Sequence, residues 1–256
     1  MDEGYSEFQV CGALAFLLPS VVKKKKNSLS FSFSGVPLLK FRIAAIRETF
    51  EESGVLVAKP EEALVKVPPA ELTKWRTLVS GDASHFIKMC KLLSIYPDVH
   101  RLHEWSNWVT PAFEAKRFDT KFFLAILDRQ PHAMHDNKEA TTTDWVTPQE
   151  VVQKNRTKEI KVMPPQFYTM FELQAVRSLE ALATEAKNKI VNPIQPEFNP
   201  AENGEVLIAF PGDPLHPSGA AKPTDKHRLL AQMDGVHMIM RLEKNIGIPS
   251  IIAGKL

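Results

Sequence analysis

The feature that most constrains the fold of this chain is the segment at residues 42–53, whose side chains recur with helical periodicity. Its apolar side chains at i, i+3 and i+7 share one helix face: Ile43, Ile46 and Phe50. Its carboxylates at i, i+3 and i+4 share another face: Glu48, Glu51 and Glu52. At about 100° per residue the two faces are roughly opposed, so the apolar face can anchor the helix while three carboxylates project together.

These carboxylates have two interpretations. Like charges one turn apart destabilise a helix by a few tenths of a kcal/mol per pair, so something is expected to offset them. Mg²⁺ and Mn²⁺ favour carboxylate oxygens, and such a cation can orient a water and lower its pKa. The other interpretation is a solvated acidic face. Arg47, which can pair with a neighbouring glutamate, and Gly54, which permits a sharp exit after the helix, favour the metal site.

The segments that follow predict alternating helices and strands. Residues 68–95 are expected to form two helices, the first carrying Leu72, Trp75 and Leu78, and the second beginning near Asp82. Strands are expected at about 101–110 and 117–127, the second ending as a buried central strand.

The C-terminal part combines helical signals with many prolines. Residues 147–150, Thr-Pro-Gln-Glu, predict a capping box that begins a helix. Residues 165–188 show a continuous helical pattern. Prolines crowd the sequence after Asn192, and only Val206–Phe210 predicts a strand there, so a loop-rich tail is expected.

Composition narrows the class of protein. A net charge of +2, from 32 basic and 30 acidic residues, argues against a protein that coats nucleic acid. With two cysteines and no redox or metal spacing, we expect Cys90 to be a buried, inert thiol. The apolar run at 10–22 is too short to span a bilayer, which needs about 20 residues, and acidic residues precede it, unlike a signal peptide.

Residues 47–55, Arg-Glu-Thr-Phe-Glu-Glu-Ser-Gly-Val, resemble the second half of the Nudix box, G-x5-E-x7-R-E-U-x-E-E-x-G-U, where U is a bulky aliphatic residue. Thr49 occupies a U position, which is a mild departure. The first half does not match, because Leu39 and Phe33 stand where the family has glutamate and glycine.

One Nudix subgroup, the nudix motif 19 type of acyl-coenzyme A diphosphatase, tolerates this gap because it carries a long insertion between the two halves of the box. The chain resembles that subgroup over about 41–180. The strings that carry the resemblance are 41–60, Trp-Ser-Asn-Trp-Val-Thr-Pro at 105–111, Arg-Phe-Asp-Thr-Lys-Phe-Phe at 117–123 and Pro-Pro-Gln-Phe-Tyr at 164–168.

The resemblance implies an α/β fold, the Nudix α/β/α sandwich with a mixed sheet and a helical insertion at about 68–95. It implies metal-dependent hydrolysis of coenzyme A or acyl-coenzyme A, a small-molecule substrate, at its diphosphate, with Mg²⁺ or Mn²⁺ as cofactor. The products are adenosine 3′,5′-diphosphate and (acyl-)phosphopantetheine. In this resemblance the metal ligands are Glu48, Glu51 and Glu52, with Arg47 supporting them by a salt bridge.

Other site residues are assigned with an alternative beside each. Glu139 completes the metal site or acts as base, or is a surface carboxylate; Asp144 is a weaker candidate. Arg117 and Lys121 hold substrate phosphates, or form a structural ion pair with Asp119. Trp105 and Trp108 are more simply expected to pack in the core than to stack on adenine.

The predicted organisation is an atypical segment at 1–40, a Nudix domain at 41–190 and a loop-rich extension at 191–256. A second hypothesis is a catalytically impaired Nudix-like protein that binds nucleotides without turnover, and a third is a Nudix pyrophosphatase for another nucleoside diphosphate derivative. The last residues, Gly254-Lys255-Leu256, are similar to a peroxisomal address read by an import receptor. The resemblance implies a peroxisomal location, because that Nudix subgroup is usually peroxisomal, with mitochondrion or cytoplasm as alternatives.

Overall fold

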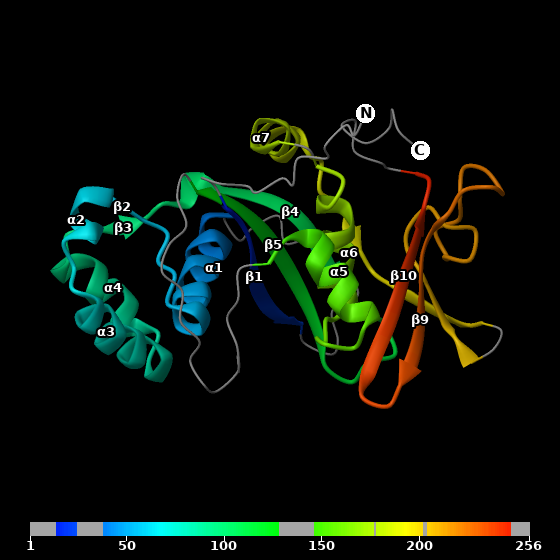
Figure 1. Ribbon diagram of the computed structural model, residues 1–256, viewed down its shortest axis with the longest axis horizontal. Coiled ribbons are helices and arrows are strands. Elements are labelled where there is room, and N and C mark those ends of the chain that lie inside the picture. The colour runs from blue at the N-terminus through cyan, green and yellow to red at the C-terminus, as the bar shows by residue number, and fades with distance from the viewer. Residues whose placement is uncertain (1–13, 25–37, 128–145, 177, 202–203, 247–256) are drawn as a thin grey trace, which may run out of the picture. The chain divides into compact units, whose positions relative to one another are not determined.

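The computed structural model describes residues 14–24, 38–127, 146–176, 178–201 and 204–246 (Figure 1). The chain divides into two compact units. Among the described residues, the first unit takes in the elements from α1 to η1, and the second those from α5 to β10. Strands β1, β4 and β5 run from one unit into the other.

The first unit is mostly helical. Its elements are α1 (Leu38–Ser53), β2 (Ala58–Lys59), α2 (Glu61–Val65), α3 (Pro69–Gly81), α4 (Ser84–Leu92), β3 (Tyr96–Pro97) and the 3₁₀ helix η1 (Val99–Arg101). Strands β2 and β3 pair antiparallel and bracket α2, α3 and α4. The helix expected over 42–53 is confirmed and begins four residues earlier, at Leu38. The two expected helices at 68–95 are confirmed as α3 and α4, while the short α2 was not predicted.

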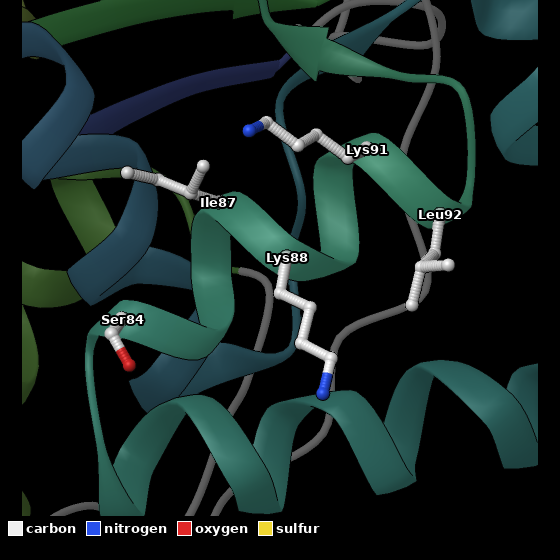
Figure 2. A pocket seen from close by; sticks show the side chains of 5 residues that line it. All are labelled: Ser84, Ile87, Lys88, Lys91 and Leu92. Atoms are coloured by element: carbon white, nitrogen blue, oxygen red, sulfur yellow. The ribbon is translucent and has the colours of Figure 1, made fainter.

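Helix α4 buries one side and leaves the other uncovered. Phe86, Met89 and Cys90 are buried, which confirms the expected burial of Cys90, and burial raises the pKa of the Cys90 thiol. The Asp82 carboxylate accepts a hydrogen bond from the backbone N–H of Ser84 at 2.8 Å, as expected of a residue that caps the start of a helix. On the outer side, Ile87 and Leu92 are exposed beside Lys88 and Lys91 (Figure 2).

A mixed four-stranded sheet has the order β1-β5-β4-β6. Its strands are β1 (Leu14–Lys24), β4 (Leu102–Val109), β5 (Arg117–Leu127) and β6 (Pro193–Ile194). Strands β4 and β6 are parallel. Strands β4 and β5 match the expected ranges, 101–110 and 117–127, closely. Phe123, Leu124 and Ala125 of β5 are fully buried, which confirms the expected central strand.

The helices of the second unit are α5 (Pro148–Arg156), α6 (Pro164–Leu173) and α7 (Leu179–Asn188). The capping box is confirmed: the Thr147 hydroxyl accepts from the Glu150 N–H at 3.2 Å, and the Glu150 carboxylate accepts from the Thr147 N–H. The prediction of one continuous helix over 165–188 is wrong, because α6 ends at Leu173 and a separate helix, α7, begins at Leu179. The Ser178 hydroxyl accepts from the Ala181 N–H at 3.1 Å and so caps this second start.

The C-terminal part contains a second sheet where the sequence predicted a single strand. Its order is β10-β9-β8-β7, with all pairs antiparallel. The strands are β7 (Glu197–Pro200), β8 (Val206–Ala209), β9 (His227–Asp234) and β10 (His237–Lys244). Strands β9 and β10 form a hairpin through Gly235, whose φ of +60° suits the short turn (Figure 1).

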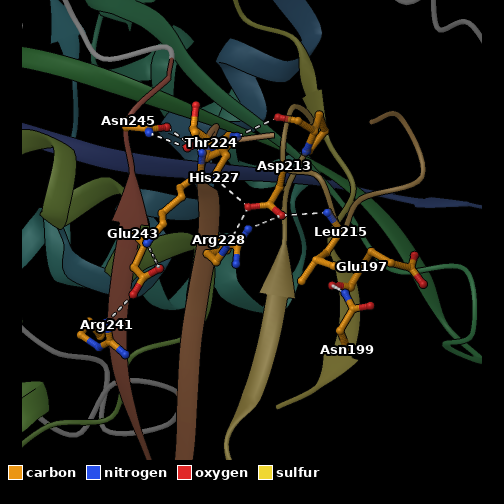
Figure 3. Close-up of polar contacts among 12 residues, drawn as sticks. Glu197, Asn199, Asp213, Leu215, Thr224, His227, Arg228, Arg241, Glu243 and Asn245 are labelled. Carbon is orange, nitrogen blue, oxygen red and sulfur yellow. Dashed lines mark hydrogen bonds and ion pairs between the residues drawn. The ribbon is translucent and has the colours of Figure 1, made fainter. Parts of the chain in front are cut away.

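Two buried polar contacts fix this sheet. The Asn155 side chain of α5 is fully buried and bonds both ways to β10, donating to the Met238 carbonyl at 2.9 Å and accepting from the Met240 N–H at 3.3 Å. Asp213 is fully buried, and its carboxylate accepts a bidentate bond from Arg228 at 2.7 and 2.9 Å (Figure 3). Asn155 satisfies backbone groups of β10, and Asp213 pairs with the charged side chain of Arg228, so both buried polar residues have protein partners. This region is therefore a specifically folded sheet and not the expected loop-rich extension.

Candidate functional site

Helix α1 is anchored by one apolar face. Its buried residues are Phe41, Ala45, Ile46, Thr49 and Phe50. Ile43, which was expected on this face, is only half-buried. Thr49 occupies an aliphatic position of the Nudix box although its side chain is polar. It can be buried there because its hydroxyl donates a hydrogen bond to the Ala45 carbonyl at 2.8 Å.

The opposite face carries the predicted carboxylates around Arg47. Its guanidinium donates to the Glu48 carboxylate at 3.1 Å and also to the Glu51 carboxylate, one turn along the helix. The three side chains are each about a quarter exposed or less, at 22%, 25% and 20%. The contact predicted for Arg47 is therefore present, and it holds two carboxylates side by side in a partly dry environment.

The end of α1 is fixed by Gly54, which the sequence predicted, and by Arg76, which it did not. The N–H of Gly54 donates to the Phe50 carbonyl at 3.0 Å, and its φ of +73° confirms the expected glycine turn. Arg76 of α3, which is buried, donates to the carbonyl of Glu51 at 2.9 Å and to the carbonyl of Glu52. A cationic side chain on the last carbonyls of a helix also complements the negative end of the helix dipole.

Arg76 was missed because the apolar residues of α3 suggested a different buried side. Leu78, one of the three apolar residues noted there, is 46% exposed, whereas Arg76 and Val79 are buried. An arginine inside an amphipathic helix usually indicates its solvent face, and no local pattern distinguishes one that caps a neighbouring helix.

The donor chemistry of the Arg47 face fits a hard divalent cation, because carboxylate oxygens are the ligands that Mg²⁺ and Mn²⁺ prefer. Within the described ranges, no group of three or more histidine, cysteine, aspartate or glutamate side chains is arranged to hold a metal ion. In the geometry described here, Glu48 and Glu51 are held by Arg47, and the convergence of all three glutamates stays a prediction.

The residues predicted to hold phosphates belong to the second unit and already have protein partners. Arg117 donates to the Thr110 carbonyl at 3.1 Å and to the Gln195 side chain at 2.9 Å. Lys121 forms an ion pair with Glu104. A phosphate at either residue would have to share or displace these acceptors, so their role in substrate binding stays a prediction.

Several predicted residues lie outside the described part of the chain. They are Phe33, Glu139, Asp144 and the C-terminal Gly254-Lys255-Leu256. Trp105 and Trp108 are described and are 1% and 5% exposed, which confirms that both pack in the interior. No helix in the described ranges has both the length and the apolar character needed to cross a membrane.

Comparison with known families identifies the fold. Residues 21–173 match the model of the NUDT19 Nudix domain. The chain belongs to the NUDT19 Nudix family. The predicted Nudix α/β class, with its mixed sheet and helices, is thereby confirmed, and the family match begins inside the segment at 1–40 that was expected to be atypical.

Three curated relatives of this NUDT19 family member share a name. It is 34% identical over 217 residues to a Xenopus laevis protein named acyl-coenzyme A diphosphatase NUDT19, covering 78% of this chain and 57% of the relative. The Gallus gallus protein of that name is 36% identical, covering 72% and 54%. The Homo sapiens protein is 39% identical, covering 56% and 41%. The chain thus spans about half the length of these relatives. No solved structure matches it significantly.

Proposed function

We propose that this chain hydrolyses the diphosphate linkage of coenzyme A and acyl-coenzyme A in the presence of Mg²⁺ or Mn²⁺. Water attacks one phosphorus of the diphosphate and the bridging P–O bond breaks. The products are adenosine 3′,5′-diphosphate and (acyl-)phosphopantetheine. The substrate class rests on the relatives, which are named acyl-coenzyme A diphosphatases, and the metal chemistry rests on α1.

The observation that carries the proposal is the geometry of α1. Arg47 joins Glu48 and Glu51, while Gly54 and Arg76 fix the end of the same helix immediately beyond Glu52. A helix anchored on one face and capped at its end holds the backbone that carries these carboxylates in a fixed position, which is what a site for a small hard cation requires.

The residues have separate roles in this proposal. Glu48, Glu51 and Glu52 would hold the cation, and Arg47 would keep the carboxylates of Glu48 and Glu51 in place between turnovers. When bound, a divalent cation would supply positive charge to the diphosphate and would lower the pKa of a water molecule. Glu139 would accept or orient the proton of the attacking water, and Arg117 and Lys121 would bind substrate phosphates.

The test is hydrolysis of acetyl-coenzyme A by the purified chain, with Mg²⁺ or Mn²⁺, following adenosine 3′,5′-diphosphate by chromatography. Glu52→Gln is expected to lower kcat by about 100-fold or more, the effect of losing one key charge at such a site. Glu62→Gln, an exposed carboxylate of α2, is the matched control and should keep full activity. Equal rates for the two variants would contradict the assignment of α1.

A second candidate function is nucleotide binding without turnover. It is favoured by Leu39, which stands at the glutamate position of the first half-box and is 50% exposed, and by the lack of a ready three-ligand group among the described residues. A folded chain that binds acetyl-coenzyme A by calorimetry but releases no product would support it. A panel of nucleoside diphosphate sugars and dinucleotides would separate the proposed substrate from other diphosphates.

A further inference from the structure

The second unit contains a cavity of about 270 Å³ whose polar lining comes from residues distant in the sequence. Its charged and aromatic members are Trp105, Tyr168, Glu172, Lys189, His227 and Lys244. All of them lie within the second unit. Nothing in the proposed hydrolysis uses this cavity, and every residue that forms it is described.

A chain of hydrogen bonds orders one wall of this cavity. Lys244 donates to the Tyr168 hydroxyl at 2.7 Å, and that hydroxyl lies 2.7 Å from Nε2 of His227. Nδ1 of His227 lies 2.8 Å from the Pro211 carbonyl, which can only accept. The ring therefore carries its proton on Nδ1 and accepts from Tyr168 on Nε2. Burial lowers the pKa of His227 to about 4, so the ring is neutral at pH 7.

The charges in the cavity do not cancel. Glu172 is the single carboxylate of the lining, and it accepts from Lys244 at 2.5 Å and more weakly from Lys189 at 3.5 Å. The side chains of Glu172, Lys244 and Lys189 are 5%, 9% and 18% exposed. Two ammonium groups and one carboxylate, with a neutral histidine, leave one positive charge that lies largely out of contact with solvent. A buried excess charge is costly unless an ion of opposite sign accompanies it.

An unused donor adds to this imbalance. Trp105 is only 1% exposed, and its buried indole N–H has no hydrogen-bond partner among the described residues. The Nζ atom of Lys189 lies 4.2 Å from the centre of the same indole ring. Buried indole N–H groups normally find an acceptor, so this one indicates an acceptor that the described part of the chain does not supply.

We propose that this cavity binds a small carboxylate anion that carries a short apolar body. The carboxylate would accept from Lys189 and from the Trp105 indole N–H, and would balance the one excess positive charge. The apolar part would lie against the apolar members of the lining, which are Ile190, Val191, Pro193, Ile194, Pro211 and Ile246. The volume admits an acid of a few carbons, since a single water takes about 30 Å³ of liquid.

The test follows the indole N–H signals of the ¹⁵N-labelled chain by NMR while sodium butanoate is added. The chain has four tryptophans, and Trp105→Phe assigns the signal of interest. Butanoate is expected to move that signal downfield with saturation, as its N–H gains a charged acceptor. Butanol, which has the same body without the charge, and inorganic phosphate, which lacks the body, should bind at least about tenfold more weakly.

Variants of two neighbouring lysines separate a binding role from a structural one. Lys189→Met is expected to weaken butanoate binding about tenfold, because one charge-assisted hydrogen bond is lost. Lys187→Met removes an exposed lysine two residues earlier, in α7, and should leave binding unchanged. The other indole signals report that each variant is folded. Absence of saturable butanoate binding, equal binding of butanol or phosphate, or equal affinity of the two variants would overturn the proposal.

Discussion

The acidic face of α1 and the basic cavity of the second unit handle excess charge in opposite ways. On α1, Arg47 holds Glu48 and Glu51, and all three side chains keep 20–25% of their surface exposed. In the cavity, Glu172 and Lys244 are less than a tenth exposed. Exposed pairs are weak and exchange partners readily, whereas a buried pair is strongly coupled to the fold. The first arrangement can therefore release its carboxylates to a cation, and the second is fixed.

The largest expected effect lies in the cavity. Lys244→Met leaves the Glu172 carboxylate buried without its nearest cation, and we expect the free energy of unfolding to fall by about 3–5 kcal/mol. Urea denaturation measures it. The double variant with Glu172→Leu should recover at least half of the loss, because no buried charge is left unpaired.

Lys226→Met is the matched control for that variant. Lys226 pairs with Glu243 while 52% exposed, so its removal should cost less than about 1 kcal/mol. A Lys244→Met variant as stable as this control would show that the buried pair is not coupled to folding.

The next effect concerns the clamp on α1. Arg76→Met removes the bonds to the carbonyls of Glu51 and Glu52 and should lower the free energy of unfolding by about 2–4 kcal/mol. Lys74→Met, an exposed change in the same helix, should have little effect. Similar urea midpoints for both variants would contradict a capping role for Arg76.

The third effect is a pH dependence from His227. Its pKa is lowered from 6.5 to about 4, so between these values the unfolded chain binds a proton that the folded chain does not. Its contribution to stability is thus complete above about pH 6.5 and falls, by on the order of 2–3 kcal/mol, as the pH drops towards 4. His227→Gln should flatten this part of the unfolding free energy against pH. An unchanged slope would remove His227 as its source.

The smallest effect concerns the turn after α1. Gly54→Ala places a Cβ in ordinary contact with Arg76, 3.5 Å from its nearest atom, so space is available. The φ of +73° still disfavours alanine, and the expected loss is about 1 kcal/mol. A shift in melting temperature measures it, with Gly81→Ala, inside α3 with open space around it, as a control that should stabilise slightly. Equal shifts for the two variants would argue against a conformational cause.

The two regions also differ in how far the sequence predicts them. The contacts of Arg47 follow from i, i+1 and i+4 spacing, and the Gly54 turn and the Thr147 capping box follow from short strings. The cavity joins Tyr168 to residues 59 and 76 positions away, and no local pattern encodes such pairings. The C-terminal hairpin is different, because Asp234-Gly235 between two apolar runs is a usable turn signal that prolines elsewhere in the segment obscured.

The hydrogen bonds of Arg76 change how the helical insertion should be regarded. From the sequence alone, the helical insertion at about 68–95 is an optional addition between the family-like strings at 41–60 and 105–111, and an engineer seeking a smaller protein would delete it first. Arg76 comes from that addition and closes the end of α1. The insertion therefore stabilises the end of the helix that carries the glutamates. A chain without it would need another donor in place of the Arg76 guanidinium to keep Glu51 and Glu52 in position.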